Sequence, residues 1–257
     1  MSANWQMALG YRGMLLVDSF RAMLNPLVLV LAWLSVTRQA GGEFSDGDYL
    51  LYYLALPVVT KVSECWTVFT LSEEIRTGTL NRHLLKPLHP LWFHVAEHLT
   101  QKILQLLHLV PVVATLAWAV GPRLPALDLS WPRLVVMGAA LALATILRFT
   151  MTTTIAMTGF WIERVENLNL VLNAAIFALM GGMVVPLETL PSWMRWVTDF
   201  LPYRYTLSFP LEILRGRITP GQAAGGFGVG AMWCLAWFVV GQRLWRRGLL
   251  AYTAHGG

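Results

Sequence analysis

Two histidines and a glutamate in the stretch HVAEH, residues 94–98, come closest in this chain to a catalytic motif. His94 and His98 are four residues apart, so on a helix their imidazoles share one face and can hold a single Zn²⁺. Glu97 would then stand beside the metal, where a carboxylate can activate a water for peptide hydrolysis. One interpretation of the chain is therefore a membrane-bound zinc metalloprotease that uses these three residues.

That interpretation needs a third metal ligand and a catalytic cavity, and the rest of the sequence offers neither in a recognisable motif. The remaining candidates for the third ligand stand in no supporting pattern; they are Glu163, Glu166, Glu188 and Glu212. Five of the six histidines lie between residues 83 and 108, so two of them fall four apart easily by chance. The competing interpretation makes HVAEH the interfacial start of a helix that enters a membrane.

The composition of the chain favours the membrane interpretation. Of 257 residues, 56% are hydrophobic and 13% are charged, against a charged share of about 25% in soluble domains. Apolar runs long enough to cross a bilayer recur along the whole length. The net charge of +5 is dispersed and forms no basic stripe with interleaved aromatic residues, so we expect no nucleic-acid partner.

The pattern predicts an all-α membrane protein with one transmembrane domain over residues 1–257. An N-terminal interfacial helix is expected within residues 3–19, an amphipathic segment at 73–90, and a segment broken by prolines at 187–213 that suits re-entrant helices. The six predicted spans cover residues 22–38, 49–71, 102–120, 134–159, 168–186 and 224–242.

The distribution of lysine and arginine orients these spans. Ten such residues flank one side of the membrane, seven flank the other, and the acidic loop around Asp46 lies with the seven. This bias places both termini and the 73–90 segment in the cytoplasm of a cell-membrane protein. Arg215 and Arg217 run against the rule, although they belong to the long broken segment.

Five polar residues inside the predicted spans are candidates for the substrate pathway. Lys61 and Glu64 are three apart on one helical face and partly neutralise each other; contact with substrate and a structural lock both remain open. For Arg148 a structural tie to Glu64 or to a partner is favoured over a role in the pathway. Asn169 and Asn173 share a face, where they line the pathway or, as is favoured, join helices.

Several stretches together resemble the ABC-2 type transporter permeases, in particular the branch of drug or viologen exporter-like permeases. These stretches are YRG at 11–13, YYLALPVV at 52–59, EEIRTGTLNRHLLKPL at 73–88, FW at 160–161, and GGMVVPLETLPSWMRWVTDFLPYRYTLSFPLEILRGR at 181–217. The resemblance covers nearly the entire chain and implies the fold of this exporter class. It also implies a chain without catalytic residues of its own, working as half of an ATP-driven export pathway.

The resemblance implies specific partners. Two ABC ATPase subunits would bind ATP and Mg²⁺, and a second permease would complete the pathway, with a different chain favoured over a homodimer. The sequence agrees with this division of labour, because it contains no G-x-x-x-x-G-K-[ST] motif and hence no P-loop; no cofactor is expected on this chain. Amphiphilic or cationic drug-like molecules, lipids and peptides all remain open as substrates, with Glu64 as the preferred contact for a cation.

The resemblance also assigns two sets of functional residues. A coupling helix that contacts the ATPase would use Glu73, Glu74, Arg76, Gly78, Thr79, Leu80, Arg82, Leu85 and Pro87. Extracellular re-entrant helices that close the exit would use Pro186, Trp193, Pro202, Tyr203, Pro210 and Glu212. In the plainer alternatives, the first segment is a solvated loop and the second only anchors the fold.

Overall fold

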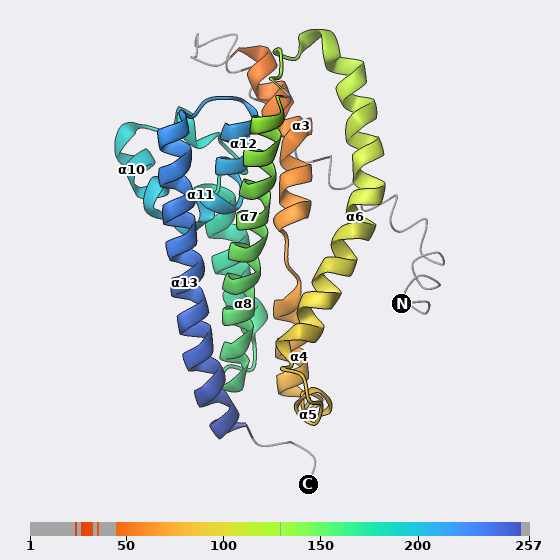
Figure 1. The fold of residues 1–257 in the computed structure, drawn as a ribbon, viewed down its shortest axis with the longest axis vertical. Helices are drawn as coiled ribbons and strands as arrows, with labels where there is room; N and C mark the ends of the chain where they lie inside the picture. Colours follow the sequence, from red (N-terminus) through yellow and green to blue (C-terminus); the bar gives the residue numbers. More distant parts are fainter. Residues whose placement is uncertain (1–23, 25–26, 33–34, 36–44, 129, 253–257) are drawn as a thin grey trace.

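The computed structural model describes residues 24, 27–32, 35, 45–128 and 130–252, and these are helical or lie in turns, with no strand among them (Figure 1). The predicted interfacial helix at 3–19 lies outside the described residues, as does most of the first predicted span. The described residues between 24 and 35 are helical.

Two helices in line form the second span. α3 runs from Asp46–Ser63 and α4 from Thr67–Arg76. Ser45 and Asp48 form a capping box at the start of α3, in which each side chain accepts a hydrogen bond from the backbone N–H of the other. Pro57 lies inside α3 without ending it, and the helix breaks only at residues 64–66.

A short helix and a long one follow. α5 spans Asn81–Leu84, and α6 spans Leu91–Val120 and is followed by the 3₁₀ turn η1 at Gly121–Arg123. α6 begins eleven residues before the predicted third span, directly after Pro90. Proline is common at the start of a helix, because a backbone N–H at that position would have no intrahelical acceptor.

Among the described elements, the most extensive packing is between α7, Trp131–Met157, and α13, Pro220–Ala251. These two helices lie side by side (Figure 1). Gly241 of α13 allows the approach, because a Cβ there would stand 2.8 Å from Thr154 Oγ1. The Thr154 hydroxyl donates to the Trp237 carbonyl at 3.0 Å, which ties the two helices.

Between α7 and α13 the chain forms an irregular helical stretch and then a series of short helices. The 3₁₀ turn η2, Thr158–Phe160, leads to α8, Val165–Asn169, the π-helix η3, Leu170–Ile176, and α9, Phe177–Met180. The short helices after it are η4 at Leu187–Thr189, α10 at Ser192–Phe200, α11 at Pro202–Thr206 and α12 at Ser208–Leu214. α10 to α12 gather at the end of the molecule where α3 begins, opposite α5 (Figure 1).

Within the described residues, four helical stretches are long and apolar enough to cross a membrane: Asp46–Arg76, Leu91–Arg123, Trp131–Phe160 and Pro220–Ala251. Val165–Met180 is apolar but shorter. One buried cluster joins α3, α7, α11 and α12, and a second joins α4, α7 and α13 at the opposite end. The chain is thus a multi-pass helical membrane protein.

Candidate functional site

The end of α4 carries the first predicted site. Gly78 adopts φ 75°, a left-handed conformation that glycine reaches without strain, and the Leu80 N–H then donates back to the Glu74 carbonyl at 3.1 Å. Arg76 donates hydrogen bonds from Nε and Nη2 to the Glu73 carboxylate at 2.6–3.0 Å. The chain therefore leaves α4 through a fixed turn, and not through a loose loop.

Beyond this turn the predicted coupling residues divide into buried and exposed ones. Leu80 is fully buried and anchors the segment in the second core cluster. Thr79 accepts or donates a hydrogen bond with the Thr77 hydroxyl at 3.0 Å. Leu85 is 87% exposed, and Arg82 and Pro87 are exposed as well. The exposed apolar side chain of Leu85, at the tip of α5, thus belongs to a segment that Leu80 anchors in the core.

Glu74 connects this segment to the start of α6. Its two carboxylate oxygens each lie 3.3 Å from a histidine Nε2, one of His83 and one of His94. Glu97 lies farther off, with its Oε2 3.8 Å from His94 Nδ1, while the ring of His98 packs on Phe149. HVAEH is therefore part of the packing between α4, α5 and α6.

The metalloprotease alternative gains no support from this geometry. Across the described part of the chain, histidine, cysteine, aspartate and glutamate nowhere form a group of three or more placed to hold a metal ion. His94 and His98 point to different neighbours although they share a helical face. His94 faces Glu74, and His98 faces an aromatic ring.

The middle of the second span contains a polar site. Lys61 and Glu64 form the ion pair expected from their spacing, at 2.9 Å. The break after Ser63 leaves carbonyl oxygens without partners in their own helix. Lys102 of α6, itself 8% exposed, donates from Nζ to the Lys61 carbonyl at 2.8 Å and to the Glu64 carbonyl.

A second helix supports the same break. Thr145 of α7 donates its hydroxyl to the Val62 carbonyl at 3.2 Å. Sequence reasoning missed the role of Lys102 at this break, because no local pattern links it to residue 61. A lysine twelve residues into an apolar helix is the one signal that could have pointed to it.

Arg148 and the two asparagines form a separate buried cluster. Arg148 donates to the Asn173 carbonyl at 2.8 Å and its guanidinium lies 3.8 Å from the centre of the Phe177 ring. Asn173 donates from Nδ2 to Asn169 Oδ1 at 2.9 Å. The structure thus brings Arg148, Asn169 and Asn173 into direct contact, while Lys61 and Glu64 pair with each other at the break, from which the charge of Glu64 still acts on Arg148.

At the opposite end, α3 is tied to the segment before α10. The Tyr52 hydroxyl donates to the Gly182 carbonyl at 2.6 Å and lies 3.3 Å from Ser208 Oγ. Tyr53, one residue on, donates to the Val184 carbonyl at 2.7 Å. Gly182 adopts φ 91°, and a Cβ there would stand 2.7 Å from the Tyr52 oxygen. This close approach requires glycine.

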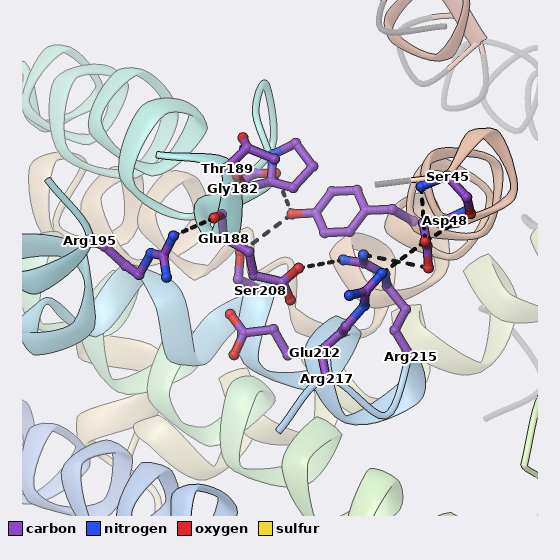
Figure 2. Close-up of polar contacts among 12 residues, drawn as sticks. Ser45, Asp48, Gly182, Glu188, Thr189, Arg195, Ser208, Glu212, Arg215 and Arg217 are labelled. Atoms are coloured by element: carbon purple, nitrogen blue, oxygen red, sulfur yellow. Dashed lines mark hydrogen bonds and ion pairs between the residues drawn. The ribbon is translucent and has the colours of Figure 1, made fainter. Parts of the chain in front are cut away.

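An ion-pair network extends this tie toward α13. Figure 2 shows Arg215 reaching Glu188 and Asp48, with Arg217 beside it. The distances are 3.0 Å from Arg215 Nη1 to Glu188 Oε2 and 2.8 Å from Arg217 Nη2 to Asp48 Oδ2. The Arg215 side chain is fully buried. Burial raises the pKa of Glu188, an effect that the positive charge of Arg215 opposes.

The predicted gate residues belong to the same end. Glu212 is 2% exposed and accepts from Arg204 at 2.6 Å, and Arg204 also pairs with Asp199. Burial acts to lower the pKa of Arg204, but the charge of Glu212 and the hydrogen bond to it raise that pKa overall. Tyr203 is buried, whereas Trp193 is 70% exposed on α10.

The three prolines of the predicted gate mark helix boundaries and core positions. Pro186 precedes η4, and Pro202 opens α11. Pro210 lies buried in α12. Sequence reasoning missed the partners in this network that come from α3, Tyr52 and Asp48, because they stand more than a hundred residues from Gly182 and Arg217.

Comparison with known proteins agrees with the resemblance of the sequence. The family model described as ABC-2 family transporter protein matches residues 23–256. No curated protein and no solved structure matches the chain. The family match covers nearly the whole chain, and the described residues form apolar helices of spanning length. The chain therefore belongs to the ABC-2 transporter family, as a multi-pass permease component of an ABC transporter that works with ABC ATPase subunits.

Proposed function

We propose that this chain forms one transmembrane half of an ATP-driven exporter and that residues 73–90 couple it to the ATPase. The observation that carries the proposal is the fixed turn at Gly78. After this turn Leu80 is buried and anchors the segment, while Leu85, five residues on, is exposed. A surface that must transmit movement has to be both accessible to its partner and rigidly joined to the helix it moves.

Charged residues next to this tip offer a second contact to the ATPase. Arg76, Glu163, Arg164 and Glu166 line a hollow of about 360 Å³ at the junction of α4 with the η2–α8 connection. Both signs of charge occur there, which suits specific recognition of a partner surface. α4 and α8 also pack together, so a force applied at this hollow acts on both.

The remaining partners follow from the family. On this proposal two ATPase subunits supply ATP and Mg²⁺, and a second permease, preferably a different chain and otherwise a second copy, completes the pathway. On this proposal the protein lies in a cell membrane, and the tip of α5 and the C-terminal end of α13, which lie at the same end of the molecule (Figure 1), face the cytoplasm. The positive residues at this end support the orientation; they are Arg82 and Lys86 in and after α5, and Arg246 and Arg247 in α13.

The opposite end then faces outward and holds the exit closed. The hydrogen bonds of Tyr52 and Tyr53 and the ion pairs of Asp48 join the start of α3 to the short helices η4 to α12. Opening the exit would require these contacts to separate. The gate is therefore assigned to this network together with the predicted residues around Glu212.

The substrate class follows from the polar residues left accessible in the spans. Lys61 and Glu64 keep side-chain exposures of 16% and 26%, whereas Arg148 is buried against Asn173 and Phe177. This difference favours Lys61 and Glu64 as pathway residues and Arg148 as a structural one. An amphiphilic substrate, with a cation opposite Glu64 where it carries one, fits this arrangement.

Changing Leu85 tests the coupling assignment. Leu85→Asp should reduce substrate-stimulated ATPase turnover of the reconstituted transporter at least tenfold. A charge that loses its water at the contact weakens binding of the ATPase by several kcal/mol, and about 1.4 kcal/mol already corresponds to a factor of ten in affinity. Leu250→Asp is the matched control, since Leu250 is 90% exposed at the same end but outside the coupling segment. Equal turnover in the two variants would contradict the proposal.

A further inference from the structure

α13 runs as a single helix of 32 residues from the end where α10 to α12 gather to the end that carries α5 (Figure 1). At a rise of 1.5 Å per residue its length is about 48 Å. The second span, by contrast, is divided between α3 and α4 at residues 64–66. A movement applied to one end of α13 is therefore carried to its other end, whereas the second span can bend between its two halves.

At the end near α5, Trp245 of α13 contacts the predicted coupling segment. It is 5% exposed and belongs to the same buried cluster as Leu80. The centre of its ring lies 5.3 Å from that of His89. The His89 ring is held in turn, because its Nδ1 accepts the Leu91 N–H at 3.3 Å. Trp245 thus joins α13 to the segment that would meet the ATPase.

Phe160, in the turn η2 after α7, packs against the same end of α13. Its ring meets those of Trp245 and Tyr252 nearly edge-on, with centres 5.8 Å apart in both pairs. Gly248 permits this approach, because a Cβ there would overlap the Phe160 ring. The position of Trp245 is therefore fixed by aromatic packing on α7 as well as by its contact with His89.

The other end of α13 is joined to the short helices. Trp233 Nε1 donates to the Phe200 carbonyl of α10 at 2.7 Å, and their two rings lie nearly edge-on with centres 5.8 Å apart. Phe227 meets Phe209 of α12 in the same manner at 5.3 Å. A Cβ at Gly226 would overlap the Phe209 ring, so α13 approaches α12 closely here. These contacts connect α13 to two of the helices assigned above to the exit.

We propose that α13 transmits the movement of the coupling segment to the helices that close the exit, with Trp245 and Trp233 as positioning residues at its two ends. The inference rests on the coupling role proposed for residues 73–90. A shift of Trp245 moves α13, and Trp233 and Phe227 then draw α10 and α12 away from the start of α3. α7 packs along α13 and moves with it.

Distances between spin labels in the assembled transporter test this, in a chain with both cysteines replaced. Labels on Leu50 of α3 and Val197 of α10 span the exit and should move apart when ATP binds, while labels on Leu50 and Phe69 report the movement of α4. Trp245→Leu should abolish the first change and keep the second, because α4 is still joined directly to the coupling segment. Trp245→Phe should restore the first change. Trp92→Leu, on a tryptophan of α6 that is 62% exposed, is the matched control and should keep both changes.

Trp233→Phe tests the other end, because it removes the N–H donor and keeps a ring. It should at least halve the change across the exit, whereas Trp131→Phe, on a tryptophan 76% exposed at the start of α7, should keep it. If the change across the exit persists in both Trp245→Leu and Trp233→Phe, the inference is wrong and the coupling role stands; persistence in one overturns the role of that residue. Loss of both changes in Trp245→Leu would show a purely structural role and overturn the inference too. If ATP changes neither distance in the unchanged chain, the coupling role fails and the inference with it.

Discussion

Among single residues, Lys102 satisfies the break in the second span from a neighbouring helix. Its ammonium group satisfies the Lys61 and Glu64 carbonyls at a depth where water is scarce. Replacing one partner of a buried hydrogen bond leaves the other partner unsatisfied, and that penalty usually exceeds the net value of the bond itself.

Lys102→Met keeps the length of the side chain and removes the charge. We expect it to lower the free energy of unfolding by about 2 kcal/mol, from two carbonyls left without a donor. Thermal unfolding of the purified chain in detergent measures this as a lower midpoint. Lys86→Met, on an exposed lysine that lies over the Phe93 ring, should change the midpoint little; a similar drop in both would contradict the explanation.

The sequence predicts residues of this kind only when their partners are close in the chain. Lys61 and Glu64 are three residues apart, and their pairing follows directly from helical geometry. Arg148 donates to the Asn173 carbonyl and lies over the Phe177 ring, while its predicted tie to Glu64 is an electrostatic interaction without a hydrogen bond. Such contacts depend on how helices pack, which spacing along one helix does not determine.

At the level of elements, the turn at Gly182 joins α9 to the segment that leads to the short helices. Its backbone angle and the nearness of Tyr52 and Ser208 leave no room for a side chain. Gly182→Ala should therefore destabilise the fold, by more than the usual 1 kcal/mol for a glycine in a left-handed conformation, because it also displaces the Tyr52 hydroxyl.

Gly138→Ala is the matched control, since a Cβ at Gly138 of α7 meets nothing within 4 Å. There alanine should be neutral or stabilising by up to about 1 kcal/mol, from its higher helix propensity. Thermal unfolding of the two variants gives the comparison directly. A Gly182→Ala protein as stable as the unchanged chain would show that this turn tolerates a side chain.

The sequence predicted the helical elements better than their interruptions. α3 continues through Pro57, a residue type that often kinks or ends a helix, and ends at Ser63. The break at 64–66 contains no proline or glycine and is stabilised by side chains from α6 and α7. The predicted break-up of 187–213 into short helices, by contrast, was readable from its prolines.

For the whole molecule, the ion pair between Asp48 and Arg217 connects two segments 169 residues apart. It also explains why Arg215 and Arg217 run against the rule that orients the spans. Both lie within 4 Å of Asp48, so their positive charge is partly neutralised by that carboxylate. Counting charges along the sequence could not reveal this.

A double-mutant cycle with Asp48→Asn and Arg217→Gln measures the strength of this connection. Because Arg217 is 39% exposed, we expect a coupling energy of only about 0.5–1 kcal/mol in thermal unfolding. Asparagine at position 48 can still accept the Ser45 hydrogen bond, so the cap of α3 is retained. A coupling energy near zero would remove this pair from the contacts that we propose to close the exit.

The break in the second span has a mechanical consequence. Tyr52 and Asp48 hold α3 on one side of the break, and α4 ends on the other side in the turn at Gly78. On the proposed coupling role, we expect residues 64–66 to act as a hinge between α3 and α4. Spin labels on Leu50 and Phe69, in a chain with both cysteines replaced, should change their separation when ATP binds the assembled transporter, while labels on Phe69 and Leu99 should keep theirs. We expect the start of α6, which His94 joins to Glu74 of α4, to move with α4, and we expect α4 to rotate about this break instead of sliding as part of one intact helix.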